Sequence, residues 1–439
     1  MVAESAIPGR AVLRYKNGRV HHGRSHRRQT GESGDDASDL DEFRRVATLI
    51  WSAVGFAALV TILGLVVFWP HGGRAQAEDQ FSDPALKAEV VSVRTAPCTG
   101  TTLADNTPCN FVGLHLDGHN IPEPAVPRGG GQPATFAGPT IEQPVSSVGN
   151  LHSGDDIYVN MTVLPDGTAS FSFYDYQRAT PMWTLTIVFV GAVLILGRWR
   201  GFGAIAGLVV SLGVIVKFLL PSILEGNSPV MVAIVAASLI GFIALYLAHG
   251  ITLPTSVALL GTFASLAVTA VLSLLFVGWS HLTGLADESA LYLTSLGVDV
   301  DLQGIVLAGF VIGALGVLDD VTVTQVSAVA ELHAAQPELG PGRLYRSAVS
   351  IGRDHISSTV NTLFLAYAGA ALPLLLLFTQ TNQSVGSLAG REVIATEIIR
   401  SLVGSIGLVS AVPITTWLAV KAIYSTAAQT THGDPLAAL

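Results

Sequence analysis

The chain has 439 residues, 50% of them hydrophobic and 13% charged, and its mean hydropathy is +0.54. Because soluble domains carry roughly 25% charged residues, this composition excludes an ordinary soluble protein and predicts several membrane-spanning helices. The net charge of −9 argues against a nucleic-acid-binding protein, which would show a clustered basic face.

Residues 1–45 are polar and lack the apolar periodicity of a folded core. We therefore expect a disordered tail, kept in the cytoplasm by its basic residues. Val46 to Phe68 is uncharged and long enough to cross about 30 Å of hydrocarbon. This run predicts a transmembrane anchor helix over 46–69. A cleaved signal peptide is the alternative, because Ala75 to Ala77 reads "AQA", like a cleavage site.

Residues 70–179 are rich in Pro, Gly, Thr and Asp and contain short runs of alternating apolar residues. They predict a small β-rich domain, such as a barrel, on the extracytoplasmic side of the membrane. The segment "TVLPDGTASFSF" is typical of a hairpin that turns at Asp166 and Gly167.

The two cysteines, Cys98 and Cys109, both fall in this β-rich segment. An extracytoplasmic location permits a disulfide between them, and two free thiols are the alternative. His115, Asp117 and His119 could bind a metal, but a strand and turn explains them better, because no other ligand-spaced residues are near. We expect no metal and no cofactor. The sequence shows neither a catalytic triad signature nor HExxH, so we expect no enzyme activity.

Residues 180–424 contain the remaining apolar runs and predict a seven-helix membrane domain, followed by a cytoplasmic C-terminal tail over 425–439. With the anchor, this gives a polytopic α-helical protein of about eight transmembrane helices. With the amino end inside, the connections that carry Arg198, Arg200, Arg343 and Arg346 are cytoplasmic, as the positive-inside rule requires, and both termini are cytoplasmic. The runs are Met182 to Leu196, Phe202 to Leu220, Val230 to Leu247, Leu253 to Val277, Gly304 to Val326, Ile356 to Phe378 and Ile398 to Val420.

Two adjacent aspartates, Asp319 and Asp320, follow a glycine-rich apolar run in one of these helices. Steps of three and four residues place small and polar residues on one face of that helix. Small residues let a neighbouring helix approach closely, so we expect this face to pack inside the bundle. The face comprises Gly309, Gly313, Gly316, Asp320, Thr324, Ser327 and Glu331.

An ionised carboxylate within a bilayer costs about 2.5–3.5 kcal/mol, so acids there usually belong to proton or ion pathways. Two adjacent carboxylates also repel each other, which favours one shared proton. Asp319 and Asp320 are therefore candidates for proton or ion coupling, with Thr324 and Ser327 as relay groups. Alternatively, the helix leaves the membrane near Leu318, and both acids lie in cytoplasmic water.

The next helix carries a second polar stripe, with Asp354, Ser358 and Asn361 on one face and Arg353 beside them. An amide at membrane depth normally needs a partner on a neighbouring helix, and one of the two adjacent aspartates is the expected partner of Asn361. The alternative is that Asn361 only holds two helices together.

Lys217 is the one base that we expect at membrane depth. Its amine either reaches the outer interface or pairs with the adjacent aspartates. Asp299 and Asp301 precede the aspartate helix, and they are expected to cap its N-terminus or, alternatively, to begin a cation path.

Three long segments within residues 180–424 resemble segments of a known family. They read "LLPSILEGNSPV", "GVDVDLQGIVLAGFVIGALGVLDDVTVTQVSAVAE" and "RSAVSIGRDHISSTVNTLFLAYAGAALPLL". These segments resemble the YibE/F-like family of bacterial membrane proteins, over roughly Thr180 to Tyr424. The resemblance implies a multi-pass protein of the bacterial plasma membrane, and it implies no defined activity.

A weaker, local resemblance concerns RND-superfamily and SecD/SecF transporters. In those proteins a helix with an intramembrane Asp or Asp pair precedes an Arg-rich loop and a helix that begins with Ser and Thr. The resemblance implies that Asp319 and Asp320 are proton-coupling acids. This chain departs from the pattern, because it has two extra helices before the matched set, a small external domain, no second repeat and no lysine within the bilayer on a later helix to pair with the acids.

Two functions are compatible with these features. The first is a proton- or ion-coupled transporter or export accessory that uses the aspartate pair. The second is a non-catalytic envelope scaffold or sensor whose extracytoplasmic domain binds a partner. An intramembrane aspartyl protease is disfavoured, because such enzymes take one Asp from each of two facing helices, and Asp354, the other candidate acid, lies at a loop boundary. The expected partners are the lipid bilayer, protons or cations, and an envelope protein or a second copy of this chain.

Overall fold

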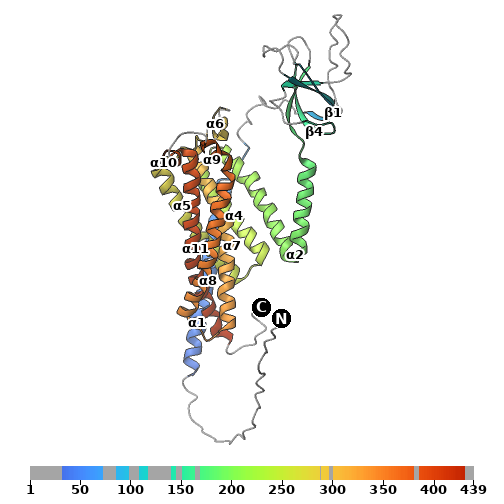
Figure 1. The fold of residues 1–439 in the computed structure, drawn as a ribbon. Coiled ribbons are helices and arrows are strands. Elements are labelled where there is room, and N and C mark those ends of the chain that lie inside the picture. Colours follow the sequence, from blue (N-terminus) through green and yellow to red (C-terminus); the bar gives the residue numbers. More distant parts are fainter. Residues whose placement is uncertain are drawn as a thin grey trace, which may run out of the picture.

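The computed structural model describes residues 32–72, 86–97, 108–116, 140–144, 151–163, 169–286, 288–295, 300–379 and 385–430. Five strands form one antiparallel sheet in the order β3-β2-β1-β4-β5. The other elements are helical, and Figure 1 draws the sheet at one end of the molecule, joined to α2. The strands are β1 (Leu86–Pro97), β2 (Pro108–Leu116), β3 (Thr140–Pro144), β4 (Asp156–Val163) and β5 (Ala169–Tyr176).

The sheet confirms the predicted β-rich segment. Strands β4-β1-β2-β3 lie in Greek-key order, and β3 also contacts β5, so the sheet is a partly closed barrel of the OB type. Alternate side chains of each strand point inward. The predicted hairpin is formed by β4 and β5, although Asp166 and Gly167 lie outside the described residues. The buried core includes Val90, Val112, Ile141, Ile157 and Val159.

Cys109 of β2 is disulfide-bonded. Cys98, the other cysteine of the chain and the predicted partner, lies outside the described residues. Because Cys109 is bonded, the alternative of two free thiols is wrong. His115 is exposed at the end of β2, while Asp117 and His119 also lie outside the described residues.

Within the described residues, six helical stretches are long and apolar enough to cross a membrane: Arg44–Val67, Ala179–Leu224, Pro229–His249, Leu253–Trp279, Leu302–Ala335 and Glu392–Ser425. They belong to a bundle in which α5 packs against α7 and α11. The helices are α1 (Glu32–Val67), α2 (Ala179–Val214), the π-helix η1 (Ile215–Leu219), α3 (Leu220–Leu224), α4 (Pro229–His249), α5 (Leu253–Trp279), α6 (Glu288–Ser295), α7 (Leu302–Ala335), α8 (Pro341–Ala370), α9 (Leu372–Thr379), α10 (Val385–Ala389) and α11 (Glu392–Thr430).

The helix boundaries differ from the prediction at three places. The first two runs of the membrane domain form a single stretch that bends at Arg198, whose φ of 51° and ψ of −127° are not helical, and Figure 1 draws α2 as two arms. The run predicted from Ile356 to Phe378 is divided between α8 and α9, and α8 begins within the predicted loop, at Pro341. Residues 32–45, expected in the disordered tail, are helical, because α1 begins at Glu32.

Close helix contacts come from glycines other than those predicted. Gly261 of α5 lies against Thr415 of α11, and Gly407 of α11 lies against Thr269 of α5. A side chain at Gly203 of α2 would lie 2.6 Å from the carbonyl oxygen of Leu247 in α4. Small residues therefore allow α5 to approach α11, and α2 to approach α4.

Candidate functional site

A groove of about 470 Å³ lies between α2, α4 and α7, and both adjacent aspartates line it. Asp319 and Asp320 contribute from α7, and most of the remaining lining is aliphatic or small. Asp319 is partly buried, whereas Asp320 is exposed to the groove. The other lining residues are Ala204, Gly207, Leu208, Ser211, Ile215, Ile240, Ala244, Leu245, Ala248, His249, Ile312, Leu315, Gly316 and Val323.

Hydroxyl groups from α5 and α7 surround Asp319 on its bundle side. The hydroxyl of Thr262 is a hydrogen-bonding neighbour of the Asp319 carboxyl, and it lies 2.7 Å from the hydroxyl of Thr322. Thr322 also donates to the carbonyl oxygen of Asp319 at 3.1 Å. The carboxyl oxygen Oδ1 of Asp319 is buried, and no group in the described part of the chain hydrogen-bonds it. Because buried polar atoms normally have partners, Oδ1 is an available acceptor.

A second cavity, of about 190 Å³, lies next to the groove along α7. The two cavities share His249 and Val323. Thr255 of α5 and Ser327 of α7 line the second cavity, so polar side chains continue beyond the aspartates toward the C-terminal end of α7. His249 was not predicted as a site residue, because its proximity to the aspartates depends on how α4 packs against α7.

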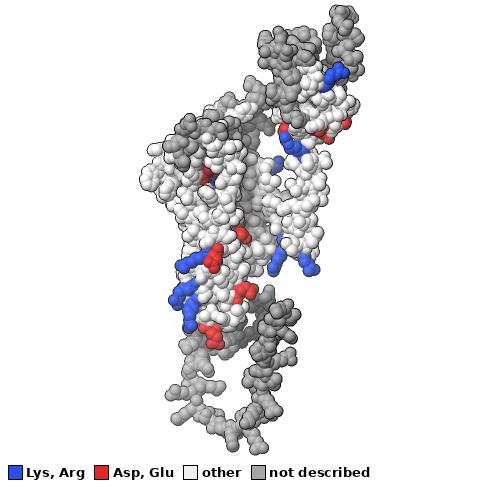
Figure 2. Space-filling view, in the orientation of Figure 1, with Lys and Arg blue, Asp and Glu red and all other residues white. Residues whose placement is uncertain are grey.

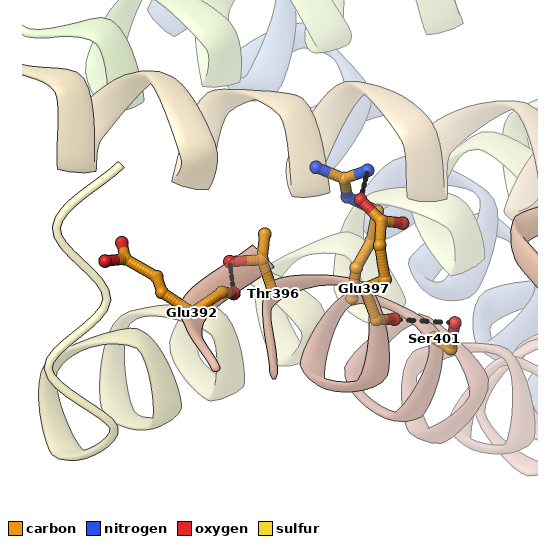
Figure 3. Close-up of polar contacts among 5 residues, drawn as sticks. Glu392, Thr396, Glu397 and Ser401 are labelled. Atoms are coloured by element: carbon orange, nitrogen blue, oxygen red, sulfur yellow. Dashed lines mark hydrogen bonds and ion pairs between the residues drawn. The ribbon is translucent and has the colours of Figure 1, made fainter. Parts of the chain in front are cut away.

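A half-buried base that the sequence reasoning overlooked lies on α11. The guanidinium of Arg400 forms an ion pair of 2.7 Å with Glu397, and Figure 3 shows this pair along α11 with Glu392, Thr396 and Ser401. Arg400 Cζ also lies 5.1 Å from the centroid of the Phe310 ring and 6.0 Å from that of Tyr367. The run "EIIRSLVG" was the signal, because it places an arginine inside an apolar helix.

A small cavity separates Arg400 from the aspartate region. Its volume is about 10 Å³, enough for roughly one water. Arg400 and Tyr367 line it, together with Leu318, the residue next to Asp319. Arg400 therefore lies beside the N-terminal half of α7, where Phe310 and Ala314 line the same cavity.

Comparison with known proteins agrees with the sequence motifs. The family described as "YibE/F-like protein" matches residues 185–425, which is more than half of the chain. The chain belongs to the YibE/F-like family. Neither a curated protein nor a solved structure matches it. The matched region of this YibE/F-like protein contains the groove, the second cavity and Arg400, and it excludes the β-sheet.

The predicted packing face of α7 is exposed in the YibE/F-like protein. No heavy atom in the described part of the chain would contact a side chain at Gly309 or Gly316, and Gly313 only meets the hydroxyl of Tyr367, at 3.5 Å. The prediction that this face packs inside the bundle is therefore wrong. The apolar residues of α7, with Thr322 and Gln325, occupy the bundle side instead. The exposed set is Gly309, Gly313, Gly316, Asp320, Thr324, Ser327 and Glu331.

The second polar stripe also faces away from the bundle. Arg353, Asp354, Ser358 and Asn361 of α8 are all exposed, because α8 packs through Leu344, Ala348 and Gly352. No hydrogen bond joins Asn361 to either aspartate in the described structure, so the expected partnership is wrong.

The remaining predicted charges also have defined positions. Lys217 lies in η1 and is exposed, and among the described residues it forms no ion pair with either aspartate. Asp301 caps α7, because its Oδ1 accepts a hydrogen bond of 2.9 Å from the backbone N–H of Gly304. This confirms the capping prediction for Asp301, whereas Asp299 lies outside the described residues.

Proposed function

We propose that this YibE/F-like protein couples movement of a solute across the bacterial plasma membrane to protons or cations. Asp319 and Asp320 take up and release the coupling ion in turn. The observation that supports this proposal most strongly is their shared position on the 470 Å³ groove. Acids at membrane depth usually face a cavity and belong to ion or proton pathways.

The second cavity supplies a route for that ion. It shares His249 and Val323 with the groove and carries hydroxyl groups from Thr255 and Ser327. Imidazole and hydroxyl groups both accept and donate hydrogen bonds, so they suit proton transfer between the aspartates and water. In this proposal Ser327 keeps the relay role expected from the sequence, whereas Thr324, Glu331 and Asn361 lie outside the route.

The distribution of basic residues supports an orientation with both termini in the cytoplasm. Figure 2 shows lysine and arginine side chains at the end of the bundle away from the sheet, where acidic side chains also lie, and at the bend of α2, with a few more on and beside the sheet. Basic residues favour the cytoplasmic side, so the sheet would then lie outside the cytoplasm, where its disulfide is stable.

A non-catalytic scaffold or sensor is the second candidate. The exposed polar face of α8 supports it, because a polar stripe on a membrane protein often contacts a partner. In that case the β-sheet would bind an envelope protein or a second copy of the chain, and the aspartates would have no part in transport.

Proton flux into proteoliposomes tests the proposal. The full-length protein is compared with Asp320→Asn and with Asp354→Asn, a matched control at an exposed acid of α8. We expect a pH gradient to drive flux through the natural protein and Asp354→Asn, and not through Asp320→Asn. Equal flux in all three proteins would contradict the proposal and favour the scaffold.

A further inference from the structure

We propose that the groove between α2, α4 and α7 binds an amphipathic organic cation. Its protonated amine lies beside Asp319 and Asp320, and its apolar body lies along the aliphatic walls. This inference rests on the proposed function, because it names the class of solute that the same carboxylates recognise.

The size and the apolar walls of the groove fit the body of an organic molecule. A volume of about 470 Å³ is in the range of small-molecule sites and greatly exceeds what an inorganic cation occupies. Aliphatic side chains line it from α2, η1, α4 and α7: Leu208, Ile215, Ile240, Ile312 and Leu315. Such walls cannot coordinate a hydrated ion, but they match a hydrocarbon or aromatic body.

The charged residues that line the groove favour a cation. Both carboxylates lie on α7, and no lysine or arginine occurs among the described lining residues. Lys217 is exposed elsewhere, and Arg400 is held by Glu397 outside the groove. A ligand with an anionic head would meet two like charges, so the groove discriminates in favour of cations.

The groove also offers hydrogen-bond acceptors that suit a protonated amine. An ammonium group has three donors and no acceptor. The exposed Asp320 carboxyl is the acceptor that such a group can reach directly, and it lies next to Asp319, whose Oδ1, unpartnered among the described residues, is buried behind the groove surface. The hydroxyl hydrogen of Ser211 is already donated to the carbonyl oxygen of Gly207, at 2.8 Å, so Ser211 presents an acceptor rather than a donor to the groove.

A fluorescent primary amine, monodansylcadaverine, tests the inference. It is titrated into the full-length protein in nanodiscs, with empty nanodiscs as the background, and its N-acetyl derivative serves as the matched neutral ligand. We expect saturable binding of the amine and at least about tenfold weaker binding of the neutral derivative, the effect of losing a charge-assisted contact.

Three variants locate the binding. Asp320→Asn removes a carboxylate, and Gly316→Leu fills the groove at a position where no described heavy atom obstructs a side chain. We expect both to weaken amine binding about tenfold or more. Asp354→Asn should bind like the natural protein. Equal binding of both ligands, or equal binding by all variants, would overturn the inference.

Failure of this inference differs from failure of the proposed function. If proton flux requires Asp320 but the amine does not bind, the coupling stands and the class of solute is wrong. If the amine binds in an Asp320-dependent manner while proton flux is unchanged in Asp320→Asn, the binding site stands and the coupling is wrong.

Discussion

The hydroxyls of Thr262 on α5 and Thr322 on α7 lie 2.7 Å apart beside the Asp319 carboxyl, and both side chains are fully buried. This contact joins the two helices at the depth of the aspartates. It therefore holds the buried side of Asp319 in place while the other side of the helix faces the groove.

Replacing Thr262 by valine tests that contact. Valine keeps the shape but leaves the Thr322 hydroxyl without its interhelical partner, so we expect a loss of about 1 kcal/mol in the free energy of unfolding. Denaturation in detergent, followed by circular dichroism, measures it. Thr362→Val is the control, because Thr362 is exposed and bonds within its own helix, to the Ser358 carbonyl. Equal losses in the two variants would argue against a special role for the contact.

At Gly352, α8 packs so closely against α7 and α11 that there is no room for a side chain. An added Cβ would lie 2.6 Å from Gln325 Oε1 and 2.6 Å from Val412 Cγ1. Overpacking of this kind costs about 1–3 kcal/mol, so Gly352→Ala should unfold at a lower temperature. Gly342→Ala, at an open position of the same helix, should not. If Gly352→Ala unfolds at the same temperature as the natural protein, α8 can shift away from α7 and α11 at little cost.

Arg400 should be replaceable by lysine more readily than by glutamine. Lysine can keep the ion pair with Glu397 but cannot stack a planar group on Phe310. Because the pair is partly exposed and therefore screened, we expect Arg400→Gln to lose only about 1 kcal/mol of unfolding free energy. Arg400→Lys should lose less. Melting temperatures of the two variants provide the measurement, and the reverse order would contradict the ion pair.

A pH effect is expected at the junction of the sheet and α2. Arg178 donates a hydrogen bond of 2.7 Å to Asp175, and this contact lowers the pKa of that carboxyl. The ion pair is therefore fully present above the ordinary aspartate pKa of about 3.9 and is lost as the pH falls through the lowered value. Arg178→Gln should raise the pKa of Asp175, measured by carbon NMR of labelled aspartate. An unchanged titration would show that the pair does not form in solution.

The sequence predicted most elements whose signals are local. Uncharged runs identified α4 and α5, alternation and an Asp-Gly turn identified the β4–β5 hairpin, and Asp301 was recognised as a cap. Helix α8 was partly missed because its polar residues resemble a loop, although they occupy one exposed face of an amphipathic helix.

The site was only partly predictable, because its geometry depends on contacts between distant segments. Helical spacing correctly put Asp320 and Gly316 on one face, but it could not tell whether that face meets a helix or a groove. His249 and Thr262 lie near the aspartates only because α4 and α5 pack beside α7. Neither residue has a sequence signal of its own.

The central proposal is that Asp319 and Asp320 take up and release protons in the groove between α2, α4 and α7. Dicyclohexylcarbodiimide tests it most directly, since this apolar reagent modifies protonated carboxyls at membrane depth and mass spectrometry locates the adduct. We predict an adduct on the peptide that carries Asp319 and Asp320, together with inhibition of proton flux through the natural protein. The double variant Asp319→Asn/Asp320→Asn should give no adduct on that peptide. An unmodified aspartate pair in a folded protein whose flux the reagent leaves intact would contradict the claim.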